Sequence, residues 1–113
     1  MMSDHELKSL RHTRILEFHK FYSEYHLWLQ SSSERFRIRI RIYETNDGRF
    51  FFVQSHYVHT PLYDGDASST QLAHDTSHLA LSHAIDSITS FYENGISAGH
   101  EPSDDWFVPN SHF

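Results

Sequence analysis

Apolar residues recur with different periods along the chain. In the first segment, residues 3–30, their spacing is that of a helix. Residues 3–30 contain no glycine or proline, and Ser3 precedes Glu6 by three positions, as in a helical capping box. At about 100° per residue the large apolar side chains share one wide face. They are Leu7, Leu10, Phe18, Phe21, Tyr22, Tyr25, Trp28 and Leu29. We therefore predict a long N-terminal helix over residues 1–30.

Strict alternation follows in residues 35–43, RFRIRIRIY, where arginines and apolar residues take successive positions. A period of two is typical of a half-buried strand, and residues 45–48, TNDG, suit a tight turn. Residues 49–60, RFFFVQSHYVHT, then return. We predict antiparallel strands over residues 35–63, either two or, with a short strand starting near HTPLY, three.

The length of the loop decides which side chains of the returning strand face the isoleucines. A loop of two or four residues puts Phe51, Val53 and Tyr57 beside the isoleucines, and beside the arginines it puts Phe50, Phe52, Gln54 and His56. A loop of three residues reverses this facing. Because the reversed facing buries Gln54 and His56, we predict the first one.

Helical spacing returns later in the chain. We predict a second helix over residues 75–94, which Asp75 or Thr76 begins and Gly95 ends. Its apolar stripe consists of Leu81, Ala84, Ile85, Ile88, Phe91 and Tyr92. The C-terminal extension, residues 95–113, is too aromatic for a disordered tail, so it should fold back on the body or dock on a partner. Together the elements predict a single α+β domain over residues 1–113, in the order α-β-β-(β)-α, with the helices on the isoleucine face.

Composition narrows the classes of function. The 113 residues include nine Lys and Arg against fifteen Asp and Glu, a formal net charge of −6, which disfavours general binding to nucleic acid or anionic membranes. The chain has no cysteine, which excludes thiolate chemistry. It has no apolar signal core and no apolar run near the ~20 residues of a membrane helix, so we expect a cytoplasmic protein without membrane association. No phosphate-binding loop, dinucleotide fingerprint or nucleophile elbow is present, so we expect neither enzymatic activity nor a cofactor.

Histidine is abundant, with eleven residues, and four of them recur every seventh residue, at His5, His12, His19 and His26. On a helix such neighbours lie about 10.5 Å apart, too far for two to share a zinc ion that binds nitrogen at about 2 Å. We interpret them as a polar flank. A pH-sensitive contact with a second helix and metal binding between chains are the alternatives.

Two other segments have partial metal-site patterns. His74 and His78 lie four residues apart and could chelate one ion, but no third ligand is evident and Asp75 also fits as a helix cap. Residues 64–68, DGDAS, resemble the start of a calcium loop, but Ser69 stands where an EF-hand needs glycine. We predict an ordinary turn there and keep His74 and His78 only as weak metal candidates.

The arginine side of the predicted hairpin is the strongest candidate site. Four of the nine basic residues lie on it, in an otherwise acidic chain. Arginine interleaved with aromatic side chains is typical of protein-interaction hot spots and of single-stranded nucleic-acid platforms. The predicted binding residues, together with those of the acidic and aromatic tail, are Arg35, Arg37, Arg39, Arg41, Tyr43, Phe50, Phe52, His56, Asp104, Asp105, Trp106 and Phe107.

Several interpretations of this side remain open. It packs on the acidic tail of its own chain or of a second copy, it binds an acidic protein, it binds nucleic acid, or it is only a solvated strand face. We predict a small non-enzymatic interaction or regulatory protein that self-associates, as a homodimer, and binds through the arginine side and the tail. A nucleic-acid-binding module that uses the same arginines is the alternative, and a histidine-based metal-binding protein is a third hypothesis.

Overall fold

A computed structural model of the chain describes residues 3, 5, 8, 9, 11, 14–62 and 73–113. Its main feature is an antiparallel sheet in the order β1-β2-β3. The strands of this sheet are β1 (His19–Ser31), β2 (Glu34–Thr45) and β3 (Phe50–Gln54). A smaller antiparallel pair continues from it and consists of β4 (His56–Val58) and β5 (Phe107–Pro109).

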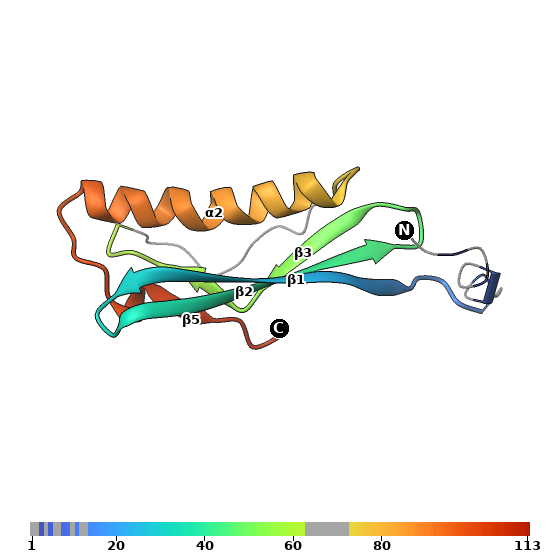
Figure 1. Cartoon of the computed structure of the whole chain (residues 1–113), viewed down its shortest axis with the longest axis horizontal. Helices are drawn as coiled ribbons and strands as arrows, with labels where there is room; N and C mark the ends of the chain where they lie inside the picture. Colours follow the sequence, from blue (N-terminus) through green and yellow to red (C-terminus); the bar gives the residue numbers. More distant parts are fainter. Residues whose placement is uncertain (1–2, 4, 6–7, 10, 12–13, 63–72) are drawn as a thin grey trace.

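The helix α2 (Ser77–Ser97) lies along one face of the strands (Figure 1). A short 3-10 helix, η1 (Asp104–Trp106), leads from it into β5. The side of the sheet opposite α2 carries no helix in the described part of the chain, and the C-terminus lies on that side (Figure 1). The two faces of the sheet therefore have different surroundings.

The predicted N-terminal helix over residues 1–30 is wrong, and with it the order α-β-β-(β)-α. Residues 19–31 form β1, and only His5, Lys8 and Ser9 are helical among the described residues before it. Leu27 and Leu29 of β1 lie opposite apolar residues of β2, so β1 widens the isoleucine face. Such cross-strand pairing outweighs local helix propensity. The predicted capping residue Glu6, like Leu7, Leu10 and His12, lies outside the described residues.

A β-bulge in β1 interrupts the alternation of side chains between the two faces of the strand, so the sequence does not show a regular period of two. The pairing with β2 shifts between Phe21 and Ser23, so Tyr22 is an extra residue. Side-chain facing is inverted across such a bulge. His19 and His26, seven residues apart, therefore share one face of a strand, where a regular strand would have put them on opposite faces. Because the period of two is broken at Tyr22, helical spacing fitted the sequence equally well.

The predicted facing of β3 is also wrong. Phe52 pairs with Ile42 and Gln54 with Ile40, so the loop between β2 and β3 has three residues. The N–H group of Gly48 donates to the carbonyl of Thr45 at 3.0 Å, and Gly48 has a φ of +77°. A turn closed by a left-handed glycine is the usual three-residue hairpin loop.

The reversed facing buries Gln54, whose side chain is satisfied within the protein. Its amide nitrogen donates to the carbonyl of His56 at 2.8 Å. The backbone carbonyl of Gln54 accepts from the side-chain amide of Asn110 at 2.9 Å. A buried polar side chain with hydrogen-bond partners is tolerated in a core, so the objection to the three-residue loop does not hold.

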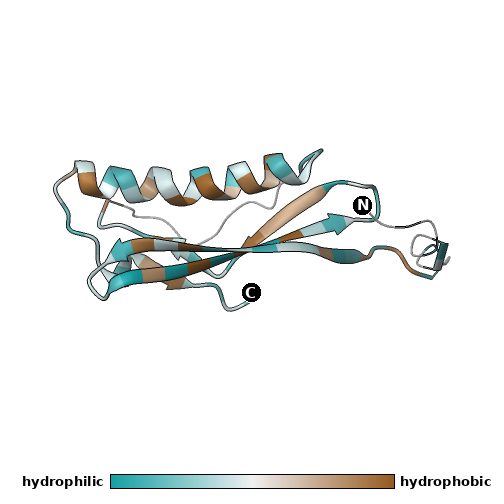
Figure 2. Cartoon of the chain, in the orientation of Figure 1, coloured by the Kyte–Doolittle hydropathy of each residue, from teal (hydrophilic) through white to brown (hydrophobic). Residues whose placement is uncertain are grey.

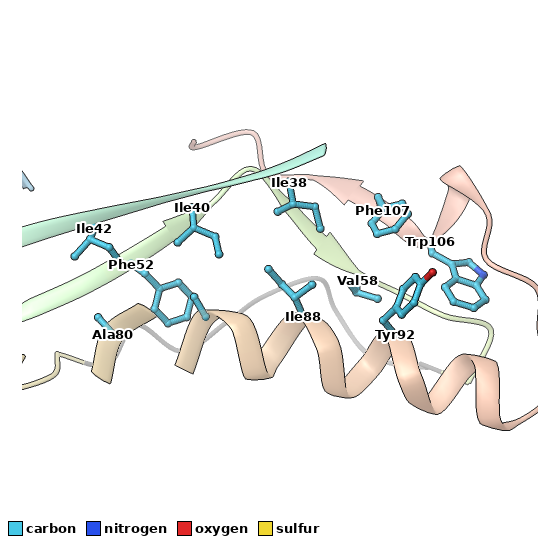
Figure 3. Close-up of a cluster of buried hydrophobic side chains, with 11 residues drawn as sticks. Ile38, Ile40, Ile42, Phe52, Val58, Ala80, Ile88, Tyr92, Trp106 and Phe107 are labelled. Atoms are coloured by element: carbon cyan, nitrogen blue, oxygen red, sulfur yellow. The ribbon is translucent and has the colours of Figure 1, made fainter. Parts of the chain in front are cut away.

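The core lies between the sheet and α2. Ile38, Ile40 and Ile42 are fully buried and point toward the helix, and Ile88 points back at them (Figure 3). Ala80 and Ala84 are also fully buried, and their small side chains bring the helix close to the strands. Along the strands, hydrophobic and hydrophilic segments alternate (Figure 2). This alternation directs the isoleucines into the core and the arginines away from it.

The boundaries of α2 differ from the predicted 75–94. The N-cap is Thr76, whose hydroxyl accepts from the N–H group of Leu79 at 3.1 Å. The helix continues through Gly95, which was predicted to end it. A Cβ atom at Gly95 would lie 2.8 Å from Thr60 and 2.9 Å from Trp106, so glycine stands there because the helix packs closely against both residues.

The C-terminal extension folds back on the body. At Ser55 the chain changes partner: its N–H group donates to the carbonyl of Arg39, and its own carbonyl accepts from the N–H group of Asn110. From there on, β4 pairs with β5. Trp106 and Phe107 are buried in the core beside Tyr92 and Phe36. The aromatic tail therefore completes the hydrophobic core.

Candidate interaction face

The face of the main sheet opposite α2 carries the predicted arginines. In register, Glu24 lies opposite Arg41, His26 opposite Arg39, and Trp28 opposite Arg37. We call this surface the arginine face. It consists of Phe21, Glu24, His26, Trp28, Arg35, Arg37, Arg39, Arg41, Tyr43, Phe51 and Val53. The arginines share this face because the isoleucines between them point into the core, and successive side chains of a strand point to opposite faces.

Arg41 is held by an acidic neighbour on β1. Its Nε atom donates to Glu24 at 2.6 Å, and the other oxygen of Glu24 lies 2.8 Å from the Nε2 atom of His26. The hydrogen bond from Arg41, and after it that from His26, lowers the pKa of Glu24 to about 2. The same bond raises the pKa of Arg41. One positive charge of the face is therefore partly neutralised within the chain.

Phe113, which was not among the predicted site residues, packs on the centre of the face. Its ring centroid lies 4.1 Å from the Cζ atom of Arg41 and 4.8 Å from that of Arg39. Both distances are within the range of a cation–π contact. The centre of the arginine face thus accepts an aromatic ring. The only sequence signal for this contact was the aromatic character of the tail.

Arg35 and Arg37 are the exposed arginines of the face. The guanidinium of Arg35 lies 5.3 Å from the ring centroid of Trp28, and the ring of His26 lies 6.1 Å from it between centroids. At this end the face presents positive charge and an exposed indole together.

An aromatic cluster forms the opposite end of the face. The rings of Tyr43 and Phe51 stack with their centroids 5.3 Å apart, and Phe21 approaches Tyr43 edge-on at 6.1 Å. Phe51 takes the place that was predicted for Phe50 and Phe52. Those two lie on the helix side, Phe50 against Tyr22 and Phe52 against His83.

The remaining predicted binding residues lie elsewhere. His56 packs edge-on against Phe36 at 4.8 Å between centroids, and burial, with the charge of Arg39, lowers the pKa of His56. The carboxylate of Asp104 accepts hydrogen bonds from the hydroxyl groups of Ser31 and Ser33 in the β1–β2 turn, and these bonds lower its pKa. Asp105 is exposed. None of the three contacts a guanidinium of the arginine face in a described hydrogen bond or ion pair.

The candidate metal ligands are not arranged as a site. The backbone of His74 pairs with that of Phe50, and its Nε2 atom lies 3.1 Å from the Nδ1 atom of His83, not beside His78. No cluster of three or more His, Asp or Glu side chains suited to a metal ion occurs in the described part of the chain. The DGDAS segment lies outside the described residues.

One open depression, of about 440 Å³, lies beside η1. Its lining consists of His59, Thr60, Pro61, His100, Glu101, Ser103, Asp105 and Trp106. Its lining shares no residue with the arginine face. No helix in the described ranges is long and apolar enough to cross a membrane.

No protein-family model, no curated protein and no solved structure matches the chain.

Proposed function

We propose that this chain is a small non-enzymatic interaction protein that binds an acidic protein segment through the arginine face. One observation carries the proposal. Four of nine basic residues share a single sheet face with exposed aromatic rings, in a chain with a net charge of −6, and no described helix covers that face. An opposite charge on the partner would steer association and fix its orientation.

The parts of the face suit different features of such a segment. Arg35 and Arg37 are exposed, and a guanidinium can bind a carboxylate through two parallel hydrogen bonds. The ring of Trp28 and the cluster around Tyr43 offer the rigid aromatic area that is common in interaction hot spots. Between them, the guanidinium groups of Arg39 and Arg41 contact the ring of Phe113. This contact supports a partner that also carries an aromatic side chain, because these two arginines already bind an aromatic ring.

Binding of single-stranded nucleic acid is the second candidate. The Phe113 contact favours it, because two guanidinium groups on one ring resemble the stacking of arginine on a base. The net charge of the chain opposes it, since phosphate backbones are bound mainly through positive charge. We therefore rank an acidic protein segment first.

Fluorescence anisotropy with defined probes tests the proposal. The probes are a labelled peptide in which glutamate alternates with phenylalanine, the same peptide with glutamine for glutamate, and a labelled oligothymidylate. We expect the full chain to bind the glutamate peptide, more weakly at higher salt, and to bind the other two poorly. Binding of the oligothymidylate alone would favour nucleic acid, and binding of no probe would contradict both candidates.

Two charge reversals provide the matched variants. Arg37→Glu changes an exposed arginine that lies opposite Trp28 on the face and should weaken glutamate-peptide binding by about tenfold or more. Arg11→Glu makes the same change at an exposed residue outside the sheet and should leave binding unchanged. Equal weakening by both variants would show that only net charge matters and that the face has no specific role.

A further inference from the structure

The two edges of the main sheet are protected differently. At the β3 edge, Phe50 and His74 exchange backbone hydrogen bonds of 2.6 and 2.8 Å, and the Arg49 guanidinium donates to the carbonyl of Ala73 at 2.6 Å. The β1 edge pairs with no described strand along its thirteen residues. A long open edge is a template for pairing with another strand.

The backbone groups that face outward from β1 can be identified from the pairing. The carbonyl of Arg39 accepts from the N–H group of Ser55, and the N–H group of Thr45 donates to the carbonyl of Arg49. Both bonds point to the β3 side, so the even-numbered residues of β2 between Arg39 and Thr45 point toward β1. Their partners in β1 are the odd-numbered residues from Ser23 on. The N–H and carbonyl groups of Glu24, His26 and Trp28 therefore point away from the sheet. Gln30 points outward as well, and its carbonyl accepts from the hydroxyl of Tyr92 at 2.8 Å.

The side chains of β1 are exposed to an unusual degree for their size. Phe21 and Trp28 are each 52% exposed, Tyr22 44% and Tyr25 40%. Tyr25 lies opposite the fully buried Ile40 on the helix face, so the core ends at this strand with an aromatic ring in solvent. Exposed apolar area of this kind, beside an open strand edge, is typical of an interface.

We infer that β1 pairs in antiparallel fashion with β1 of a second copy of this chain. The regular part of the strand, residues 23–31, runs from the bulge to the turn, and its midpoint is Leu27. Pairing about an axis near His26 and Leu27 uses the outward groups of Glu24, His26 and Trp28 in both copies. It places Tyr25 of each copy against the leucines of the other and covers both rings.

Charge favours a second copy as the occupant of this edge. Residues 23–31 contain one acidic residue, Glu24, and no Lys or Arg. Two copies of a chain with a net charge of −6 therefore meet along a segment of low charge, and no pair of like charges is forced together near its centre. The result is one sheet with three strands from each copy, both α2 helices on one side and two arginine faces joined on the other. This pairing rests on the β1 edge alone and does not depend on what the arginine face binds.

Sedimentation velocity of the full chain and two matched variants tests the inference. We expect the wild type to sediment as a dimer of the 13.3 kDa chain. Tyr25→Lys places a positive charge at the edge of the helix face, where natural edge strands use lysine against pairing, and should give a monomer. Leu79→Lys makes a similar change at a half-exposed position of α2 and should remain a dimer. A monomeric wild type, or a dimer that Tyr25→Lys does not dissociate, would overturn the inference.

Amide hydrogen exchange of the wild type provides a test that needs no variant. In the paired state, the outward amides of Glu24, His26 and Trp28 should exchange more slowly as the protein concentration rises. The inward amides of Tyr25, Leu27 and Leu29 are bonded to β2 in either state and should depend much less on concentration. Outward amides that exchange rapidly at every concentration would exclude pairing at this edge, whatever the oligomeric state.

Discussion

The sheet contains two hairpins, and each has one turn residue in the left-handed region, but the two turns have different origins. The β2–β3 turn places Gly48 in the left-handed region, with a φ of +77°, and its sequence TNDG suits that conformation. The β1–β2 turn places Glu34 there, with a φ of +79°. A non-glycine residue in this region is strained.

The second turn is stabilised from outside. The carboxylate of Asp104 accepts hydrogen bonds from the hydroxyl groups of Ser31 and Ser33, and Asp104 lies at least 71 residues after them in the sequence. The N–H group of Asp104 also donates to the hydroxyl of Ser32 at 3.0 Å. Trp106, two residues further on, anchors this segment in the core. A hairpin can therefore be formed by its own turn residues or held by a distant segment, and mutations at the two turns separate the two cases.

Removal of the anchor should have the largest effect. Trp106→Ala removes a buried aromatic side chain and should destabilise the protein by about 3–5 kcal/mol, measured by urea denaturation. In native-state hydrogen exchange, amides around Ser33 should lose more protection than amides around Gly48. Val108→Ala, a smaller change in the neighbouring strand, serves as the control. Equal loss of protection at both turns would contradict a specific role of the tail in the first hairpin.

A change at the local turn should come next. Gly48→Ala forces a side chain into the left-handed region and should cost about 1–2 kcal/mol. A Cβ atom at Gly48 meets no neighbouring atom, so the cost reflects backbone conformation and not a clash. Thermal denaturation should show a lower melting temperature, and an unchanged value would mean that the turn adopts another conformation.

The opposite change at the strained turn should stabilise the protein. Glu34 is exposed, so Glu34→Gly removes little packing while it relieves the unfavourable φ. Glycine also loses more conformational entropy on folding than glutamate does, which reduces the gain in stability. We expect a net gain of about 0.5–1 kcal/mol in the same denaturation assay. A loss of stability would show that the carboxylate of Glu34 has a role of its own.

The smallest effect should be a dependence on pH that belongs to the first hairpin alone. Hydrogen bonds from Ser31 and Ser33 hold the pKa of Asp104 below its usual 3.8. A carboxylate with a lowered pKa stabilises the folded state above its unfolded pKa, and this contribution is lost as the pH falls through the lowered value. The difference in melting temperature between wild type and Asp104→Asn should therefore be present at neutral pH and shrink below about pH 4.

Asp105→Asn is the matched control for this measurement, because Asp105 is exposed and adjacent. Its melting temperature should follow the wild type at every pH. A constant difference between Asp104→Asn and the wild type down to the lowest pH would show that the charge of Asp104 does not stabilise the turn.

Local features of the sequence were sufficient for β2 and α2. The alternation from Arg35 to Tyr43 correctly predicted a strand with isoleucines inside and arginines outside. The helical spacing after Thr76 predicted α2, apart from its end. For the candidate site, the same alternation identified the four arginines and Tyr43. It missed Phe51 and Phe113, because one depends on loop length and the other on the path of the tail. It also missed Glu24, His26 and Trp28, because residues 1–30 were predicted as a helix and form β1 instead.

Taken alone, the sequence determined those features whose cause lies within a few residues: the period of two in β2, the position of the turn at Gly48, and the apolar stripe of α2 apart from Phe91, which is exposed. Only the tertiary structure decided that residues 19–31 form a strand, because their bulge breaks the local period and the gain comes from pairing with β2. It also decided the facing of β3 and the place of the tail. Cross-strand pairing and packing against other elements supply most of the stabilisation of such features, and a pattern within a few residues contains no record of them.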